Sequence, residues 1–328
     1  MLTPDDVAAA AARIETHVRR TPLEVSGPMS ERTGAAVAIK AEHTQHTGSF
    51  KLRGALNTIL SLTGSERAAG VVTASSGNHG IATATAARIA DCACTVYLPT
   101  GASPAKVAAI ARLGATIETV DSTDAFHAEV AARDTARATG RTYVSPYNDP
   151  RVMAGQGTVG LELAAQFADI GWDGADAVVV AVGGGGLVSG VATWLAATHP
   201  DTVIVGASPA NDCAMLHSVA AGDVDAWPAA PTFSDGTAGG LEPGAATLDL
   251  CRRLVGEWTT VTETEIATAV TAMIDDHHQL VEGAAGVALA AATAYGIANP
   301  GRRVVAITCG ANVSSTALAA MLATAGTA

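Results

Sequence analysis

The alternation of β-branched and alanine-rich segments constrains the fold of this chain more than any other feature. Short runs of Val, Ile and Thr have the composition and length of strands. Eight such runs follow one another, at residues 36–42, 70–74, 94–99, 115–120, 142–146, 176–182, 202–208 and 303–309. Helix-forming segments lie between most of them, and strands separated by helices make parallel sheets with helices on both faces. The sequence therefore predicts an α/β fold.

Two of the helical segments have recognisable starts. Thr3 stands where an N-cap is expected, with Pro4 at the first helical position and acidic residues in the first turn. Ser103 and Pro104 repeat this pattern before the next alanine-rich segment. We expect both segments to begin as α-helices at these prolines.

The order of the elements indicates two domains. Residues 70–146 hold four of the predicted strands and three intervening helices, which is enough for a small domain. The remaining residues, 1–69 and 147–328, would then form one discontinuous large domain. We expect the small domain to be mobile relative to the large one.

Composition excludes several classes of protein. The net charge is −12, so the positive surface of a nucleic-acid-binding protein is missing. The first residues lack the basic segment and apolar core of a signal peptide, and no apolar run is long enough to span a bilayer. We therefore expect a cytoplasmic protein that binds neither nucleic acid nor membrane.

The cysteines point to a reducing compartment, because there are five and they are scattered. Cys92 and Cys94 are separated by one residue in a segment that reads as a strand, so we expect their side chains on one face. A zinc site needs further ligands close to them, and the sequence shows none. We predict no metal site there.

One lysine lies in an unusual setting. In a chain with only 15% charged residues, Lys51 stands among small and apolar residues in "HTGSFKLRGA" (46–55). It follows a Gly-Ser turn at the predicted start of a helix. This position indicates an amine that is used for chemistry.

A run of four glycines follows the predicted strand 176–182 and precedes a predicted helix. Backbone N–H groups of Gly183, Gly184, Gly185 and Gly186 can converge on one anion, and the helix N-terminus adds its dipole. The dinucleotide fingerprint fails, because Val188 or Ser189 stands where its last glycine belongs, and no Gly-Lys-Ser/Thr follows. The run predicts a phosphate site, with a ligand-free tight turn as the alternative.

Two further strand ends carry polar groups or a thiol. Ser75, Ser76, Asn78 and His79 lie at the start of a predicted helix, where they suit a carboxylate or serve only as an N-cap. Cys309 ends the strand 303–309, where an isolated thiol is usually a small core residue.

An amine, a phosphate cradle, a carboxylate loop and a thiol together fit a phosphate-bearing aldehyde cofactor held as a Schiff base. The chain resembles the fold-type II pyridoxal-phosphate (PLP) enzymes, specifically the serine/threonine dehydratase and serine racemase family. The matching segments, in family order, are "KAEHTQHTGSFKLRGA" (40–55), "SSGNHG" (75–80), "AGQGT" (154–158), "VGGGGLVSG" (182–190), "DGTAGG" (235–240) and "CGAN" (309–312). The resemblance implies two three-layer, open parallel-sheet domains of the tryptophan synthase β type, and a homodimer.

The resemblance also implies roles for individual residues in holding the cofactor. Lys51 would hold the aldehyde as a Schiff base and later move the Cα proton, and Phe50 would lie against the ring. Asn78 would hydrogen-bond the phenolic oxygen, and Cys309 would face the pyridine nitrogen. The phosphate would rest on Gly183, Gly184, Gly185 and Gly186.

The same resemblance implies how the amino-acid substrate binds. Ser75, the loop backbone at Gly77, and His79 would receive its carboxylate. Ser76 would lie on the ring face opposite Lys51, where racemases place a second acid/base group.

A thiol at position 309 favours elimination. A neutral thiol cannot stabilise a pyridinium by charge, so the β-substituent should leave before the carbanion persists. We therefore expect dehydration of a 2-amino-3-hydroxy acid such as threonine or serine to a 2-oxo acid and ammonia. The small residues at 236–240 keep a bulkier substrate such as 3-phenylserine open, and Ser76 keeps an amino-acid racemase open.

Alternatives from other classes are a non-catalytic binding protein and a nucleotide-dependent oxidoreductase. The presence of Lys51 and Ser76 argues against the first, and the broken dinucleotide fingerprint argues against the second. A β-replacement enzyme of the cysteine-synthase kind is disfavoured, because its asparagine-containing lysine loop differs from residues 47–55 of this chain.

Departures from the family pattern concern a metal and the pocket wall. Ser208 stands where cation-activated relatives have glutamate, and Asp212 is the nearby acid, so we predict no metal dependence. The sequence leaves open whether four residues face the pocket or end helices: Glu242, His277, His278 and Glu282. His277 and His278 fit the C-terminal end of a helix, where the dipole favours them.

Overall fold

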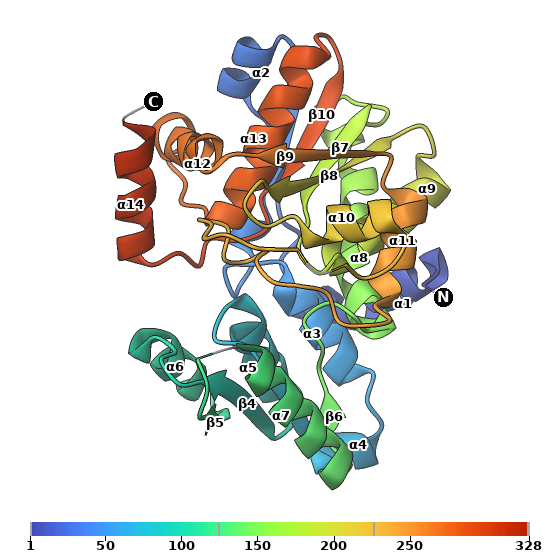
Figure 1. The fold of residues 1–328 in the computed structure, drawn as a ribbon. Helices are drawn as coiled ribbons and strands as arrows, with labels where there is room; N and C mark the ends of the chain where they lie inside the picture. The colour runs from blue at the N-terminus through green and yellow to red at the C-terminus, as the bar shows by residue number, and fades with distance from the viewer. Residues whose placement is uncertain (1, 124, 226, 327–328) are drawn as a thin grey trace.

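Two separate parallel sheets organise the molecule, as a computed structural model shows for residues 2–123, 125–225 and 227–326 (Figure 1). The larger sheet has strand order β1-β2-β10-β7-β8-β9, and the smaller has β5-β4-β3-β6. The strands are β1 Leu23–Val25, β2 Ala36–Lys40, β3 Val71–Ala74, β4 Cys94–Pro99, β5 Thr116–Val120, β6 Thr142–Tyr143, β7 Ala177–Ala181, β8 Val203–Pro209, β9 Glu257–Val261 and β10 Arg303–Ile307. Every neighbouring pair is parallel except β1 and β2, which confirms the predicted α/β class.

Helices fill most of the connections between the strands. They are α1 Pro4–Ile14, α2 Gly27–Thr33, α3 Lys51–Leu60, α4 Gly64–Ala69, α5 Asn78–Ile89, α6 Pro104–Ala111, α7 Ala125–Thr139, α8 Pro150–Gln166, α9 Gly186–Thr198, α10 Ala214–Ala221, α11 Ala246–Leu254, α12 Glu263–His277, α13 Gly283–Ala298 and α14 Ser315–Ala325. The predicted start of α1 is confirmed, because Thr3 and Asp6 form a capping box. Before α6, Ser103 occupies the N-cap position, but its side chain makes no capping hydrogen bond.

All eight predicted strands are present, and two more were missed. β1 has only three residues, and β9 is half-exposed along most of its length, so neither shows a clear apolar pattern. The prediction for Cys92 was wrong, since β4 begins at Cys94. Cys92 lies before the strand, where its thiol donates to the Arg67 carbonyl at 3.4 Å.

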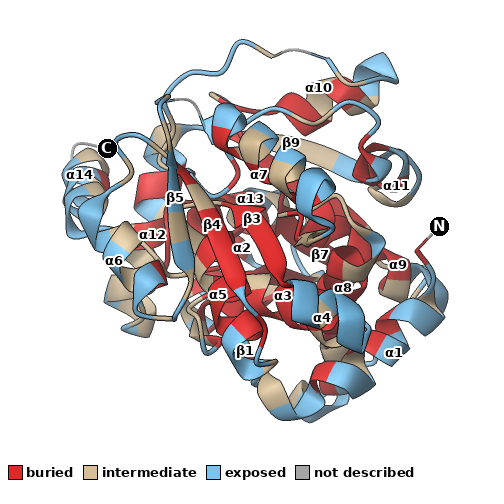
Figure 2. Cartoon of the chain, turned by 90° about the horizontal axis from the view of Figure 1, so that it is seen from below, coloured by how far each residue is buried: buried red, intermediate tan, exposed pale blue. Residues whose placement is uncertain are grey.

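The smaller sheet is covered on both faces. Successive residues of β3 point to opposite sides, so Val71 packs into a cluster with Leu52 of α3 and Ala82 of α5, whereas Val72 packs with Ala128 of α7. Figure 2 shows β3 and β4 buried between these layers. All four strands lie within 70–146, yet α3 adds to their core from outside that range. The division into two domains, and the mobility of the smaller, stay predictions.

Buried strands dominate the larger sheet. All five residues of β7 are buried, and the apolar residues of β10 are buried as well. α13 packs on β7 and β10, while α9 packs on β7 and β8 and is itself covered by α8. No helix in the described part of the chain is long and apolar enough to cross a membrane. This buried sheet presents the ends of β7 and β10 to the space beside the smaller sheet.

Candidate active site

A cavity of about 760 Å³ lies where the carboxyl ends of β3, β7 and β10 meet. In open parallel sheets this is the edge where ligands bind. Every site residue expected from the sequence lines this one cavity: Phe50, Lys51, Ser75, Ser76, Gly77, Asn78, His79, Gly183, Gly184, Gly185, Gly186 and Cys309. These residues come from four separate segments, which the fold brings together.

Lys51 is the first residue of α3, and the loop before it is pinned to the end of β10. The Phe50 amide donates to the Cys309 carbonyl at 3.1 Å. The Lys51 Nζ donates to the Pro146 carbonyl at 2.8 Å and lies 5.2 Å from the centroid of the Phe50 ring. Burial lowers the pKa of Lys51 to about 8, because desolvation penalises the ammonium form. The amine can therefore be neutral near physiological pH.

The four glycines form the turn between β7 and α9. Gly185 has φ +82°, a left-handed conformation that side chains other than glycine rarely adopt, and α9 begins at the next residue. A side chain at Gly184 would overlap the Tyr147 ring. Within the described residues, the amides of this turn have no hydrogen-bond partner outside the helix. A turn of free amides at a helix N-terminus fits a phosphate group.

The polar loop after β3 leads into α5. Ser75 Oγ accepts from the Gly77 amide at 3.1 Å, and α5 begins at Asn78 without a side-chain cap. Ser76, the next residue along the chain, also lines the cavity. The uncapped N-terminus leaves backbone donors, and the binding of a carboxylate by this loop stays a prediction.

His79 lines the cavity with a buried side chain. Its Nε2 donates to the Val144 carbonyl at 2.9 Å, and burial lowers its pKa to about 3. The ring is therefore neutral, and Nδ1 carries a lone pair with no partner among the described residues. The imidazole brings no positive charge to a carboxylate, and its contact with Val144 holds the loop in place.

Glu282, whose position the sequence left open, forms a hydrogen-bond network with Asn78 and Asn312. Asn78 Nδ2 donates to both carboxyl oxygens of Glu282, at 2.8 and 3.0 Å. Asn312 donates from its backbone to Glu282 at 3.2 Å and from Nδ2 to Asn78 Oδ1 at 2.7 Å. Burial raises the pKa of Glu282 to about 7. The network fixes the amide of Asn78 in one orientation.

Cys309 lies beside this network. Its Sγ is 3.9 Å from Glu282 Oε1, and burial raises the pKa of the thiol well above its usual value. The group is a neutral thiol at physiological pH, as the sequence argument assumed.

The remaining undecided residues separate into two sets. Glu242 lines the cavity and forms an ion pair with Arg133 of α7. His277 ends α12 and contacts Ser26 Oγ at 3.0 Å, and His278 is the cap that follows it. The two histidines therefore lie at a helix C-terminus and outside the cavity lining.

Ser208 and Asp212 are both occupied by local hydrogen bonds. Ser208 Oγ donates to the Val182 carbonyl at 3.0 Å, and Asp212 Oδ2 accepts from the Gly239 amide at 2.8 Å. Within the described residues, no group of three or more His, Cys, Asp or Glu side chains is placed to hold a metal. Independence from divalent cations stays a prediction.

Comparisons with known proteins agree with this geometry. A family model described as "Pyridoxal-phosphate dependent enzyme" matches residues 14–310. The chain is 38% identical to the L-threonine ammonia-lyase of Thermotoga maritima over 89% of its own length and 71% of that protein. It is 36% identical to the beta-hydroxyaspartate dehydratase of Paracoccus denitrificans over 95% of its own length and 96% of that protein. The solved structure of maize serine racemase superposes with a TM-score of 0.89 at 31% identity, covering 98% and 97% of the two chains.

The fold, the free glycine amides and the buried amine define an enzyme that uses an aldehyde cofactor with a phosphate tail. The chain belongs to the family of pyridoxal-phosphate-dependent enzymes, and PLP is its cofactor. The predicted resemblance to fold-type II threonine dehydratases and serine racemases is thereby confirmed, and it makes the chain a dehydratase-like lyase. The oxidoreductase alternative is wrong.

Proposed function

We propose that the protein is an ammonia-lyase that dehydrates a 2-amino-3-hydroxy acid of the threonine or serine type. The products are a 2-oxo acid and ammonia. The observation that carries this proposal is the buried amine of Lys51, which shares one cavity with the tetraglycine turn and the polar loop. The names of the similar proteins support the same class of substrate.

In this proposal the cofactor is held at both of its ends. The amides of residues 183–186 bind the phosphate, Lys51 binds the aldehyde, Phe50 lies against the ring, and Asn78 binds the phenolic oxygen. Cys309 faces the ring nitrogen as a neutral thiol. Bound PLP supplies an electron-poor ring that acidifies the Cα–H bond of an attached amino acid.

The protein then moves one proton. The neutral amine of Lys51 takes the Cα proton at Nζ, and its lowered pKa places it close to working pH. The same proton leaves with the β-hydroxyl as water, so the step is balanced. Ser75, Ser76 and the uncapped start of α5, including Gly77, hold the substrate carboxylate. Because Cys309 leaves the ring without a charged partner, elimination is favoured over reactions that need a long-lived carbanion, such as transamination.

A bulkier substrate such as 3-phenylserine is a second candidate, supported by the wall formed by 236–240. A Cβ built at Gly239 or Gly240 meets nothing within 4 Å, so the wall leaves open space there. Part of the 760 Å³ is the volume that PLP occupies, and the rest exceeds what a methyl group needs.

Release of 2-oxo acid from L-serine, L-threonine, 3-hydroxyaspartate and 3-phenylserine tests the proposal. We expect turnover of threonine or serine by the PLP-loaded protein and none by Lys51→Ala. Chiral analysis of the unreacted serine measures racemisation in the same sample. Turnover of 3-phenylserine alone would select the second candidate, and rapid racemisation without 2-oxo acid would contradict both.

The proposal also covers the cellular location, the oligomeric state and the domain movement of the enzyme. We propose a cytoplasmic homodimer in which the smaller sheet and its helices move relative to the larger one. Two ion pairs cross between these parts beside the cavity, Lys106 with Asp235 at 3.5 Å and Arg133 with Glu242. The Lys106–Asp235 pair is exposed and contributes little, whereas Arg133 and Glu242 are partly buried, so the movement must break the second pair.

A further inference from the structure

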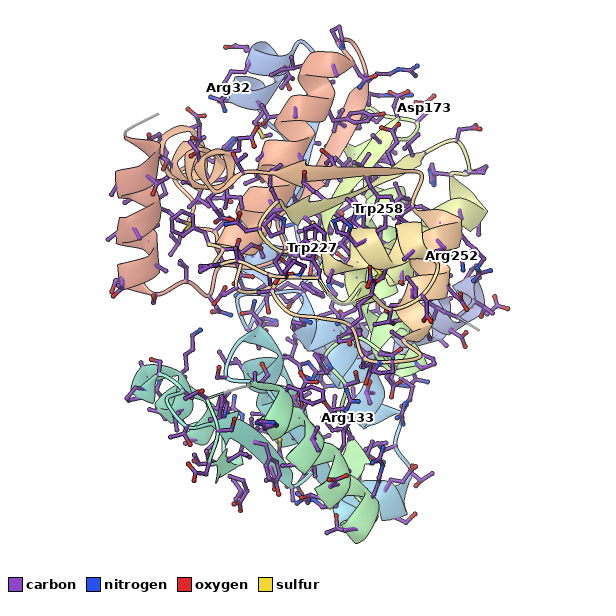
Figure 3. The ribbon with its side chains drawn as sticks, viewed as in Figure 1. Arg32, Arg133, Asp173, Trp227, Arg252 and Trp258 are labelled. Carbon is purple, nitrogen blue, oxygen red and sulfur yellow. The ribbon has the colours of Figure 1, made fainter. Side chains whose placement is uncertain are left out.

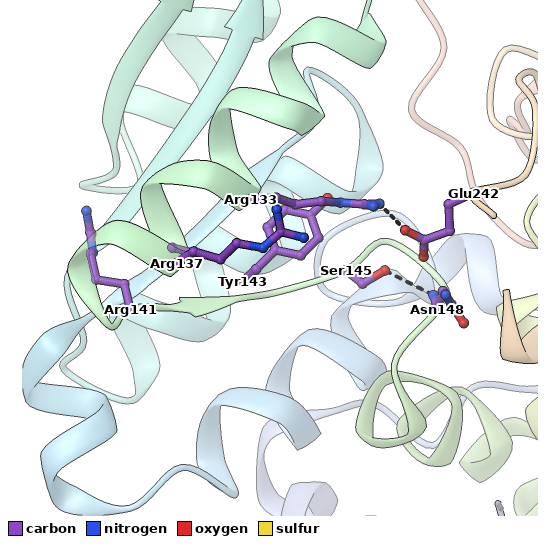
Figure 4. Close-up of a pocket in the computed structure, with 8 residues that line it drawn as sticks. Arg133, Arg137, Arg141, Tyr143, Ser145, Asn148 and Glu242 are labelled. Carbon is purple, nitrogen blue, oxygen red and sulfur yellow. Dashed lines mark hydrogen bonds and ion pairs between the residues drawn. The ribbon is translucent and has the colours of Figure 1, made fainter. Parts of the chain in front are cut away.

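A second hollow of about 380 Å³ adjoins the active-site cavity, and the two share Arg133, Arg137 and Glu242, to which the proposed reaction assigns no role (Figure 4). It is formed by the C-terminal half of α7, by the segment 141–148, which contains β6, and by Glu242. We call it the arginine groove, and it is lined by Arg133, Ala136, Arg137, Arg141, Tyr143, Ser145, Asn148 and Glu242.

Positive charge is concentrated in the arginine groove. Arg133, Arg137 and Arg141 follow one another at intervals of four residues, and Glu242 is the one carboxylate among the described residues that line the groove. In a protein with a net charge of −12, three arginines on one wall are a local excess of the opposite sign. Such a concentration attracts anions, and carboxylates of the protein already offset part of it, since Arg133 pairs with Glu129 and Glu242 and Arg137 pairs with Asp134 at 3.3 Å.

Two of these guanidinium groups have unused donors. The Nε atoms of Arg133 and Arg141 are buried and have no hydrogen-bond partner among the described residues. Arg141 uses Nη2 to donate to the Val71 carbonyl at 3.1 Å. The dipole at the end of α7 would account for an exposed arginine such as Arg137, whose side chain is 77% exposed. It does not account for buried donors that are left without acceptors.

The geometry and spacing of the guanidinium groups indicate the kind of ligand. A guanidinium group binds carboxylate or phosphate oxygens through two parallel hydrogen bonds. Arg133 and Arg137, four residues apart on α7, are separated by about 6 Å along its axis, and Arg141 lies beyond the end of that helix. A single phosphate or carboxylate group cannot bind all three arginines, whereas a ligand with several such groups can.

We propose that the arginine groove binds a multivalent oxyanion, a small molecule with two or more phosphate or carboxylate groups. Glu242 now occupies part of this site, because it pairs with Arg133 (Figure 4). The ligand therefore competes with Glu242 for Arg133. Removal of that carboxylate makes the site more available.

Isothermal titration calorimetry of the PLP-loaded protein tests this, since PLP then fills the tetraglycine turn. Pyrophosphate, tripolyphosphate and citrate are titrated separately at low ionic strength, so that phosphate and carboxylate sources are distinguished. We expect one saturable site for at least one probe. Arg137→Gln and Arg141→Gln should each weaken it about tenfold, as expected for the loss of a charged hydrogen bond. Glu242→Gln should tighten it.

Arg252→Gln is the matched control, because Arg252 is exposed on α11 and lies away from the groove (Figure 3). It removes the same charge and should leave binding unchanged. If Arg141→Gln disturbs folding through Val71, the exposed Arg137 still provides the test. Three results would overturn the proposal: no saturable binding of any probe, binding unchanged in the soluble groove variants, or equal weakening by Arg252→Gln.

Discussion

At the scale of single residues, burial shifts two ionisable groups of the cavity toward their neutral forms. Burial lowers the pKa of Lys51 to about 8 and raises the pKa of Glu282 to about 7. Desolvation penalises the charged form of each, an ammonium in one case and a carboxylate in the other. Both groups can therefore gain or lose a proton near neutral pH, as acid/base catalysis requires.

Glu282→Gln tests the buried acid in cofactor-free protein. A carboxyl whose pKa is raised on folding stabilises the fold fully below about pH 4.5, and this contribution is lost as pH rises through about 7. The wild type should therefore lose about 3 kcal/mol relative to the variant between these pH values. Urea unfolding at a series of pH values measures the difference. Parallel pH profiles for the two proteins would show that Glu282 is not desolvated.

Ser76→Ala separates the two reactions that the cavity allows. Racemisation needs a proton donor on the face opposite Lys51, and the resemblance to racemases implies this role for Ser76, in addition to its proposed contact with the substrate carboxylate. Formation of D-serine from L-serine should fall by roughly 100-fold or more, the size of a lost general acid, while release of 2-oxo acid falls less. Chiral chromatography and a 2-oxo acid assay on the same samples measure both. An equal fall in the two rates would assign Ser76 to binding alone.

Sequence motifs predict contiguous parts of the site better than its long-range contacts. Lys51, Asn78 and the tetraglycine turn each lie in a short segment with its own signature. Glu282 was undecided because its contact with Asn78 spans 204 residues. Its position just before α13 is compatible with an ordinary helix start, so only the fold shows that it faces the cavity.

At the scale of elements, the turn between β7 and α9 combines a backbone requirement with a binding requirement. The sequence predicts this strand, turn and helix because a buried apolar run, glycines and a helical segment follow one another. It could not predict β9, which has a half-exposed pattern at the edge of the sheet. Edge strands have one neighbour and therefore a weaker apolar signature.

Gly185→Ala and Gly222→Ala separate the two requirements of the turn. Both glycines have a left-handed conformation, with φ +82° and +85°, so each alanine should cost about 1 kcal/mol or more of stability. Gly222 caps α10 in open space, whereas Gly185 belongs to the proposed phosphate site. Only Gly185→Ala should also weaken PLP binding, measured by the fluorescence change on titration. Equal PLP affinity in the two variants would contradict the assignment of the turn.

At the scale of the whole molecule, Arg53 connects parts of the chain that are distant in sequence. Its buried guanidinium donates to Glu42 after β2, to Glu162 of α8 and to the carbonyl of Arg19. Although burial alone would raise the pKa of Glu42, the positive charge of Arg53 holds it below its usual value. Because Arg53 lies two residues after Lys51 in α3, this network also anchors the helix that carries the proposed catalytic amine.

Arg53→Met should destabilise the fold by roughly 3–5 kcal/mol, because it leaves Glu42 buried without its partner. The loss is full above about pH 4.5 and shrinks as pH falls through the lowered pKa of Glu42. Urea unfolding at pH 7 and at acid pH measures it. Arg252→Met, at an exposed position, should change stability by less than about 0.5 kcal/mol. A similar small effect at Arg53 would mean that the buried network does not hold the fold.

The central claim is that Lys51 carries the cofactor, and the sequence makes it directly testable. The chain contains three lysines, Lys40, Lys51 and Lys106, of which Lys40 is paired with Glu162 and Lys106 with Asp235. Borohydride reduction of the PLP-loaded protein, followed by mass mapping of its peptides, identifies the lysine that binds the aldehyde. We expect the reduced cofactor on the peptide that contains Lys51 and on no other. Its recovery on Lys40 or Lys106, or the absence of any stable adduct, would contradict the account.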